Sequence, residues 1–411
     1  MSIFKITQNQ TSTYNITGSN NTWILKQGVQ ISSTADGISE PSVLAHNSYV
    51  IDGKVLGLGV SSNAMSLAGD NTDVEIGDKG ELSGKIGIKS LGDHLKISNS
   101  GVISADDAGV EIHGSQSSMI NHGGLSSTTG AALSVLNVDR FSFVNDGEMS
   151  GVKGISSEAA NLSVKLGKHS AIETSGTTIE NISETGDTAH IVNMGNLSSD
   201  GNIFSLVIDG REGEETVRNS GKIIGSVSLG GGEDRYDGRG GSVSGVIAAG
   251  AGDDTYILGS KDDFVVEGDN AGYNDRIITN FSYTLADDVH VEHLFLSGRG
   301  NFNIHGNSSS NVMMGNAGNN RVDSGAGVDF LYGGKGKDFL IGGDGADHFY
   351  FVSNQDKEIV TDFVDGIDQI YLDIDTHDIK NIKDALAHHT HQVGNDVVIS
   401  GDGTEMIIKH L

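Results

Sequence analysis

Glycine, asparagine and aspartate recur with a fixed period between Gly306 and Tyr350. This stretch divides into five nonapeptides, GNSSSNVMM, GNAGNNRVD, SGAGVDFLY, GGKGKDFLI and GGDGADHFY. In the last three, the sixth residue is an aspartate and the eighth is apolar. Glycine permits backbone angles that other residues rarely adopt, so a short turn can aim its carbonyl oxygens inward beside the aspartate carboxylate. Turns rich in oxygen atoms suit a hard divalent cation.

Calcium takes six to eight oxygen ligands, and one such turn supplies about half of them. Successive nonapeptides should lie on opposite sides of a coil with two strands, so turns that share an ion should be eighteen residues apart. Asp329 and Asp347 then contribute two carboxylates to one site. The pairs of Asn311 with Asp329, and of Asn320 with Asp338, each lose one charge to an amide and should bind more weakly. The candidate ligand residues, turn glycines included, are Asp329, Asp338, Asp347, Gly325, Gly327, Gly334, Gly336, Gly343, Gly345, Asn320 and Asn311.

The composition limits the classes of protein to which the chain can belong. Its 411 residues include 59 glycines, one proline and no cysteine, and the formal net charge is −29. Without cysteine, a disulfide scaffold, a cysteine zinc site and a cysteine nucleophile are excluded. Residues 1–227 hold 25 acidic and 14 basic residues, and residues 228–411 hold 30 and 12. A surface this acidic repels nucleic acid, so we expect no nucleic-acid partner.

A looser repeat, with a period of 21 to 27 residues, extends from Trp23 to Gly225. An apolar residue stands four positions before the anchor of every repeat, and eight of nine repeats have one two positions after it. A period of this length, with an apolar strand on each side of a glycine corner, predicts a parallel β-solenoid. Residues 1–21 are expected to cap its first coil. The anchors are Gly28, Gly53, Gly80, Gly101, Gly123, Gly147, Ser170, Gly195 and Gly221, and the first apolar positions are Ile24, Tyr49, Ile76, Ile97, Met119, Phe143, Leu166, Ile191 and Val217.

Asparagine recurs two positions before the anchor in five of these repeats, and Asp78 takes the same position in another. Such a row could bind a ligand. A ladder of stacked amides that bond the backbone of neighbouring corners is favoured instead, because asparagine suits turns of this kind. The row consists of Asn99, Asn121, Asn145, Asn193 and Asn219.

The period changes at Leu229. The segments LGGGEDRYD and AGAGDDTYI each carry the aspartate-turn pattern once, which places Asp234 and Asp254 twenty residues apart and predicts one short roll with a calcium site. Further along, VEHLFLSG precedes GNSSSNVMMGNAGNNRVDSGAGVDFLYGG. In this order, residues 229–350 resemble the hemolysin-type calcium-binding family, also called RTX proteins. The resemblance implies a calcium-binding β-roll, although Asn311 and Asn320 replace the aspartate of the family pattern.

Residues 359–373, IVTDFVDGIDQIYLD, look like the cap that follows the roll in the serralysin C-terminal family. By this resemblance Asp362 and Asp368 close the last calcium site; the alternative is that they are solvated acids of a turn. A short helix over residues 379–389 and a hairpin, DVVISGDGTEMIIKHL, are expected to follow. The resemblance also implies an export signal in residues 359–411 for the type I secretion machinery. The N-terminus lacks the pattern of a secretory signal.

Few residues could support catalysis. The chain has no HExxH motif, and the nearby His388, His389 and His391 are more simply incidental than a metal site. A polysaccharide lyase or epimerase is the main alternative to a non-enzymatic protein, because parallel β-helices often carry these activities. It would need a carboxylate and a base, which Asp52, Asp78, Lys79 and His122 could supply from successive corners. The scarcity of aromatic residues in residues 1–227 and the uniform coils argue against an enzyme.

The sequence therefore predicts an all-β protein in three parts. Residues 1–227 form a parallel β-solenoid of about nine coils, residues 228–358 an RTX calcium-binding parallel β-roll region, and residues 359–411 a C-terminal cap. We expect a secreted protein, extracellular or bound to the cell surface, whose C-terminal part folds when it binds calcium. A structural or adhesive role is favoured, with cell-surface polysaccharide or like subunits as candidate partners. No stretch approaches the eighteen apolar residues of a transmembrane helix.

Overall fold

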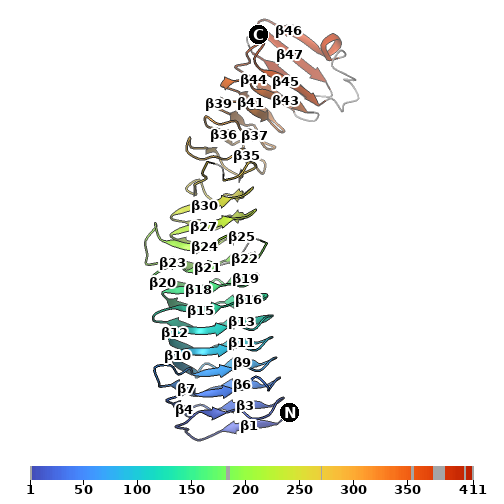
Figure 1. The fold of residues 1–411 in the computed structure, drawn as a ribbon. Helices are drawn as coiled ribbons and strands as arrows, with labels where there is room; N and C mark the ends of the chain where they lie inside the picture. Colours follow the sequence, from blue (N-terminus) through green and yellow to red (C-terminus); the bar gives the residue numbers. More distant parts are fainter. Residues whose placement is uncertain are drawn as a thin grey trace. The chain divides into compact units, whose positions relative to one another are not determined.

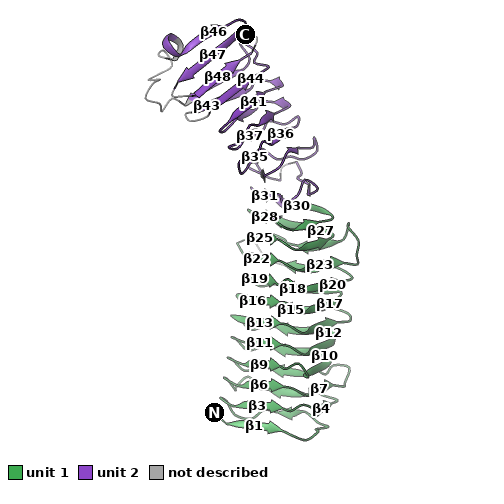
Figure 2. Cartoon of the chain, turned by 180° about the vertical axis from the view of Figure 1, so that it is seen from behind, with its two compact units in different colours: residues 1–235, 240–249 green, residues 236–239, 250–411 purple. Residues whose placement is uncertain are grey.

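The structure is a computed structural model that describes residues 2–181, 186–269, 271–352, 356–373, 385–401 and 404–409. It is nearly all β-strand, with about 1% helix, and forms a parallel β-solenoid of about 16 turns. The predicted all-β class and parallel solenoid are confirmed. The chain separates into two compact units, residues 1–235 with 240–249 and residues 236–239 with 250–411 (Figure 2). The boundaries of the three predicted domains stay a prediction.

In unit 1 the strands form three parallel stacks, so a full coil has three strands rather than the two that the repeat pattern predicts (Figure 1). The first stack contains β1 (Ile3–Ile6), β3 (Thr22–Leu25), β6 (Ser48–Ile51), β9 (Asp73–Ile76), β11 (Lys96–Asn99), β13 (Ser117–Asn121), β16 (Arg140–Asn145), β19 (Asn161–Leu166), β22 (Thr188–Asn193) and β25 (Glu214–Asn219).

The other two stacks share two long strands, β10 (Glu81–Ser90) and β12 (Val102–Ile112), each of which runs through both of them. The second stack contains β4 (Gln30–Ser33), β7 (Lys54–Gly57), β14 (Gly124–Ser127), β17 (Glu148–Gly151), β20 (Ala171–Thr174), β23 (Asn196–Ser199), β26 (Lys222–Ile224) and β29 (Ser242–Val243). The third contains β2 (Tyr14–Asn15), β5 (Ile38–Glu40), β8 (Met65–Leu67), β15 (Ala131–Val135), β18 (Lys153–Ser157), β21 (Ile179–Asn181), β24 (Leu206–Asp209) and β27 (Ser226–Gly231).

The core of unit 1 consists of apolar side chains that stack in register from coil to coil. In the first repeat the predicted apolar position is wrong by one residue: Trp23 and Leu25 are buried, whereas Ile24 between them is partly exposed. Trp23 lies in register with Tyr49, and Phe4 stacks on its indole ring with a centroid distance of 4.2 Å. Strand β1 pairs with β3, so the N-terminal residues add strands to the first coil, as expected of a cap. The buried column contains Trp23, Tyr49, Val74, Ile97, Met119, Phe143, Val164, Ile191 and Val217.

The asparagine ladder is confirmed. Asn99 donates its Nδ2 hydrogen to Oδ1 of Asn121 at 2.7 Å, and Asn121 donates in turn to Asn145 at 2.7 Å. The next rung is the hydroxyl of Ser170, which accepts from Asn145 at 2.6 Å. A second run joins Asn193 to Asn219 at 2.9 Å. All five asparagines are fully buried, so each hydrogen bond between their side-chain amides satisfies polar groups that cannot reach water.

The placement of Asp78 in this ladder is wrong. Its coil has a wider corner, so that Ile76, not Asp78, pairs with Asn99. The displaced Asp78 lies on the surface, where its carboxylate is 3.4 Å from the ammonium group of Lys79. Leu166 takes the ladder position in the other coil with a wide corner.

Unit 2 has two main stacks of parallel strands (Figure 1). Val312 pairs with Phe330 and Phe330 with His348, which confirms the predicted strand period of eighteen residues in the nonapeptides. The apolar eighth residues of the last three nonapeptides, Leu331, Leu340 and Phe349, are fully buried. One stack contains β31 (Thr255–Ile257), β33 (Arg276–Thr279), β35 (His293–Leu296), β37 (Val312–Met314), β40 (Phe330–Tyr332), β43 (His348–Val352) and β45 (Gln369–Asp373), and the other contains β34 (Tyr283–Thr284), β36 (Asn303–His305), β38 (Arg321–Asp323), β41 (Lys337–Ile341) and β44 (Lys357–Val360).

The second stack of unit 2 ends in three further strands. Strand β48 (Thr404–Ile408) pairs in parallel with β44 and antiparallel with β47 (Asp396–Gly401), which confirms the predicted hairpin. Strand β46 (Thr390–Val393) lies antiparallel on β47. Residues 385–389 form a one-turn π-helix, Ala385–His389, and the remainder of the predicted helix lies largely outside the described residues. The remaining strands are β28 (Arg235–Asp237), β30 (Val246–Ala251), β32 (Phe264–Val265), β39 (Ala326–Gly327) and β42 (Asp344–Gly345).

Candidate metal centre

The sixth residue of each nonapeptide is fixed to the coil before it by a hydrogen bond. The backbone N–H of Asn311 donates to Oδ1 of Asp329 at 2.6 Å, and that of Asp329 donates to Oδ1 of Asp347 at 3.1 Å. On the other side of the roll, the backbone N–H of Asn320 donates to Oδ1 of Asp338 at 2.6 Å. The sequence-predicted pairs are therefore neighbours in space, eighteen residues apart.

Each of these three aspartates keeps one carboxylate oxygen without a partner. Oδ2 of Asp329, Asp338 and Asp347 is buried and has no hydrogen bond. Burial raises the pKa of Asp329 to about 6 and that of Asp338 to about 7, and it also raises the pKa of Asp347. A buried carboxylate oxygen that bonds nothing is costly, and a cation removes the cost. The residues thus fit the calcium ion that the turns imply.

Glycine is required where successive turns stack most closely. Gly343 has a φ of 88°, and a Cβ atom there would lie 1.9 Å from the carbonyl oxygen of Gly325 one coil earlier. Strand β39 pairs in parallel with β42 through Gly327 and Gly345, which holds the two turns against each other. The predicted turn glycines with positive φ are Gly325, Gly327, Gly334, Gly336, Gly343 and Gly345.

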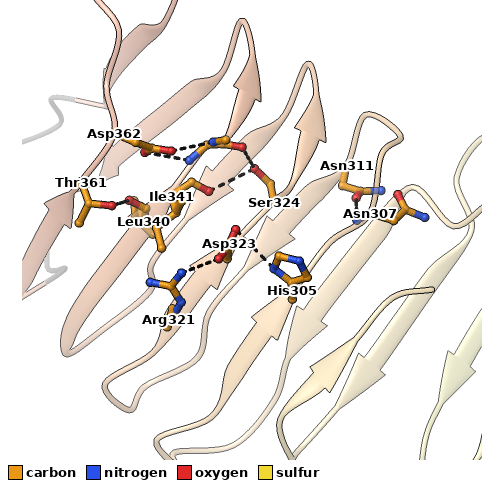
Figure 3. A network of polar contacts seen from close by, with 12 residues as sticks. His305, Asn307, Asn311, Arg321, Asp323, Ser324, Leu340, Ile341, Thr361 and Asp362 are labelled. Atoms are coloured by element: carbon orange, nitrogen blue, oxygen red, sulfur yellow. Dashed lines mark hydrogen bonds and ion pairs between the residues drawn. The ribbon is translucent and has the colours of Figure 1, made fainter. Parts of the chain in front are cut away.

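Asn311 and Asn320 differ from the aspartates because both the nitrogen and the oxygen of each side-chain amide form hydrogen bonds. The Nδ2 group of Asn311 donates to the carbonyl oxygen of Val291 at 3.0 Å, and that of Asn320 donates to Phe302 at 2.8 Å. The Oδ1 atom of Asn311 accepts from a backbone N–H group of its own turn (Figure 3). The Oδ1 atom of Asn320 does the same in its turn. These bonds hold the turns in place without a cation, which supports the expectation of weaker binding there.

Asp362 and Asp368 both contact the last nonapeptide. Oδ1 of Asp368 accepts from the backbone N–H of Asp347 at 2.9 Å, so it continues the series of Asn311, Asp329 and Asp347. Asp362 instead accepts from the backbone N–H groups of Gly342 at 3.1 Å and Gly343 at 2.7 Å (Figure 3). Both carboxylates lie where the last turn would need further ligands.

Glu358 is a candidate ligand that the sequence pattern does not reveal. It pairs with Asp338 across β41 and β44, so it follows Asn320 and Asp338 on the second side of the roll. Its side chain is fully buried, neither carboxylate oxygen has a hydrogen bond, and burial raises its pKa to about 9. A Cβ atom on Gly333 would lie 2.0 Å from Oε2 of Glu358, so the carboxylate enters the turn that Gly333 opens. Glu358 does not fit the nonapeptide pattern, because it is a glutamate and lies twenty, not eighteen, residues after Asp338.

The two isolated aspartate turns are found in different units. In unit 1, Oδ1 of Asp234 accepts from the backbone N–H of Glu215 at 2.6 Å. In unit 2, the backbone N–H of Asp254 donates to Oδ1 of Asp275 at 2.7 Å. Asp254 is fully buried and Asp234 nearly so, and calcium binding at either residue stays a prediction.

The residues of the alternative enzyme site lie at the corners of unit 1. The side chains of Asp78 and Lys79 form an ion pair and are 78% and 59% exposed. His122 is also exposed.

Paired glycine turns with buried aspartates on a parallel coil define the class of this centre, a calcium-binding β-roll. The family model for the RTX calcium-binding nonapeptide repeat (4 copies) matches residues 305–340 and 323–356. The chain contains RTX repeats, and repeats of this family bind calcium. No curated protein matches the chain. Within the described ranges, no helix has the length and apolar character needed to span a bilayer.

Proposed function

We propose that the chain is a secreted structural or adhesive protein whose unit 2 folds when it binds calcium. The observation that carries this proposal is the set of buried carboxylate oxygens without partners on Asp329, Asp338 and Asp347. Proteins with RTX repeats are typically secreted. Millimolar calcium outside cells then suits a unit whose buried carboxylates need a cation.

Calcium should decide whether unit 2 is compact. Without the ion, like charges repel and many glycines oppose ordering, at about 1–2 kcal/mol of backbone entropy per residue. A cation that binds only the folded state adds about 2.7 kcal/mol per site when its concentration is a hundredfold above Kd. Several coupled sites would therefore convert an unfolded chain in a calcium-poor cytosol into a folded one outside.

A calcium titration of the purified full chain tests this proposal. Far-UV circular dichroism should show a cooperative gain of β signal when calcium is added to chelated protein, and a chelator should reverse it. Magnesium at the same concentration is the control, because it demands a smaller octahedral site. A β signal that does not change on chelation would contradict calcium-dependent folding.

Export should depend on residues 359–411, which carry the resemblance to the serralysin cap. Deletion of this segment should retain the protein inside a cell with a type I secretion system, while the full chain appears in the medium. Asp362→Asn with Asp368→Asn serves as a control that alters the charge but keeps the segment. Export of residues 1–358 at the normal yield would refute the location of the signal.

A hollow of about 510 Å³ on unit 1 favours polysaccharide as the partner class. It lies over β17, β20 and β23 and is lined largely by hydroxyl and carboxylate groups that could hydrogen-bond sugars. We expect the calcium-loaded protein to bind one member of a panel of neutral and uronate polysaccharides without forming product, and Glu173→Gln to weaken this binding. Product formation would favour the lyase or epimerase alternative. Self-association without any sugar binding would favour like subunits as partners.

A further inference from the structure

Three acidic residues of unit 2 converge outside the nonapeptides. Asp254 directly precedes β31, Glu267 follows β32, and Asp275 directly precedes β33. One carboxylate oxygen from each residue lies within 4.8 Å of the others. Their exposures are 0%, 2% and 0%, so all three carboxylates are removed from water.

The immediate surroundings hold this cluster in place but leave one oxygen for a ligand. Oδ1 of Asp275 accepts from the backbone N–H of Asp254, whereas its Oδ2 is buried and has no hydrogen bond. The hydroxyl group of Tyr256 donates to Oε2 of Glu267. A Cβ atom on Gly272 would lie 2.7 Å from Oδ2 of Asp275, so only glycine leaves room there. Gly342 has the same relation to Oδ2 of Asp347, at 2.3 Å, in the last nonapeptide.

The electrostatics of the cluster also favour a bound cation. Burial raises the pKa of Glu267 to about 7 and that of Asp275 to about 7, and the nearby charge of Asp254 contributes to both increases. Glu292 accepts from the backbone N–H of Asp275 at 2.9 Å and adds another negative charge nearby. Like charges packed in a low-dielectric space repel strongly unless a cation lies among them.

We propose that Asp254, Glu267 and Asp275 bind a calcium ion at a site separate from the nonapeptide turns. Three carboxylates make a set of hard oxygen ligands, which suits calcium and does not suit metals that prefer nitrogen or sulfur. The assignment of calcium rests on the proposed function, whereas the site itself rests on this geometry. A glutamate from the segment after β32, together with two aspartates from separate turns, distinguishes it from a pair of nonapeptide turns.

The number of calcium ions bound per full-length chain tests this site. Equilibrium dialysis should show one ion fewer for Asp275→Asn and one ion fewer for Glu267→Gln. The double variant should also lose one ion, not two, because both residues hold the same ion. Asp262→Asn is the matched control, since Asp262 is an exposed acid of the same segment. An unchanged number in both single variants would overturn the proposal.

The same experiment separates this site from the proposed function. If Asp347→Asn changes calcium binding while Asp275→Asn and Glu267→Gln do not, the nonapeptide sites stand and the new site fails. If the acid variants lose one ion but calcium leaves the β signal unchanged, the site stands and calcium-dependent folding fails.

Terbium luminescence gives a second measurement of this site, and it does not require a variant of any of the three acidic residues. Terbium replaces calcium at oxygen sites and emits when a nearby tyrosine is excited, and Tyr256 contacts Glu267 directly. Part of the tyrosine-sensitised emission of the wild-type chain should vanish in Tyr256→Phe and stay in the exposed control Tyr273→Phe. Emission equal to that of the wild type in Tyr256→Phe would overturn the proposal.

Discussion

At the scale of single residues, buried carboxylates are surrounded differently in the two units. Each buried carboxylate must find donors or a cation, because water cannot reach it. In unit 1, Glu40 is satisfied by protein groups: Asn47 donates to its Oε1 at 2.7 Å and Thr72 to its Oε2 at 3.2 Å. In unit 2, Asp329 and Asp347 each accept one backbone hydrogen bond at Oδ1, and their buried Oδ2 atoms have no hydrogen bond. We therefore expect the folding of unit 2 to depend on calcium.

Asp347→Asn should weaken calcium binding and raise the calcium concentration at the midpoint of folding, by about tenfold or more for the loss of one charged ligand. Asp347 has a carboxylate on both sides, since its Oδ1 accepts from Asp329 and its N–H donates to Asp368. In the sequence pattern, by contrast, Asp329 is the residue shared by two pairs of turns, one with Asn311 and one with Asp347. Asp344→Asn is the control, because Asp344 is an exposed acid of the same nonapeptide. Calcium titrations by circular dichroism should separate the two variants, and equal midpoints would contradict a ligand role for Asp347.

Glu40 predicts a pH dependence of unit 1. Burial raises its pKa, so the folded state holds the proton more tightly than the unfolded state. Stability should then be greatest below the ordinary glutamate pKa of about 4.5 and should fall as the pH rises through the folded pKa. Glu40→Gln should remove this slope, while Glu75→Gln, an exposed acid of β9, should keep it. Denaturant unfolding at pH 5 and pH 8, followed by emission of the single tryptophan Trp23, measures the slope.

At the scale of elements, the period of a repeat is readable from sequence, but the shape of its coil is less so. The nonapeptide period yields the eighteen-residue strand register because every position is occupied without insertions. The third strand of the longer repeat cannot be recognised from the sequence period, because strands such as β18 and β21 begin at different distances from the glycine corner. Wider corners also shift Asp78 and Ile76 relative to Asn99. Glu358 is missed because strand pairing, not sequence spacing, brings it to Asp338.

The asparagine ladder should be a major source of stability for unit 1. Asn121 accepts from Asn99 and donates to Asn145, so Asn121→Ala removes one hydrogen bond from each of two buried neighbours. Each lost partner costs about 1–3 kcal/mol, and we expect a loss of roughly 2–4 kcal/mol in the free energy of unfolding. Ser142→Ala, an exposed position of β16 in the next coil, should cost under about 0.5 kcal/mol. Denaturant titrations that give equal losses for the two variants would show that the ladder adds nothing.

At the scale of the whole molecule, the two units should respond to calcium separately. Apart from the aspartate turn of Asp234, unit 1 buries stacked apolar columns and satisfied amides, which need no metal. The acidic cluster found among the described residues, and the nonapeptide aspartates, belong to unit 2. Contacts in a solenoid run mainly between neighbouring coils, so loss of one region need not unfold another. Calcium should therefore act on the C-terminal coils first.

Chelation of the full chain measures this separation, because the only tryptophan lies in the first coils. The indole ring of Trp23 is buried and stacked on Phe4, so its emission reports the fold of unit 1. We expect a chelator to remove part of the far-UV β signal and to leave the emission of Trp23 unchanged. Denaturant added afterwards should red-shift this emission in a separate transition, which shows that the probe responds when unit 1 unfolds. A red shift on chelation alone would mean that unit 1 also depends on calcium, and the separate responses would then be refuted.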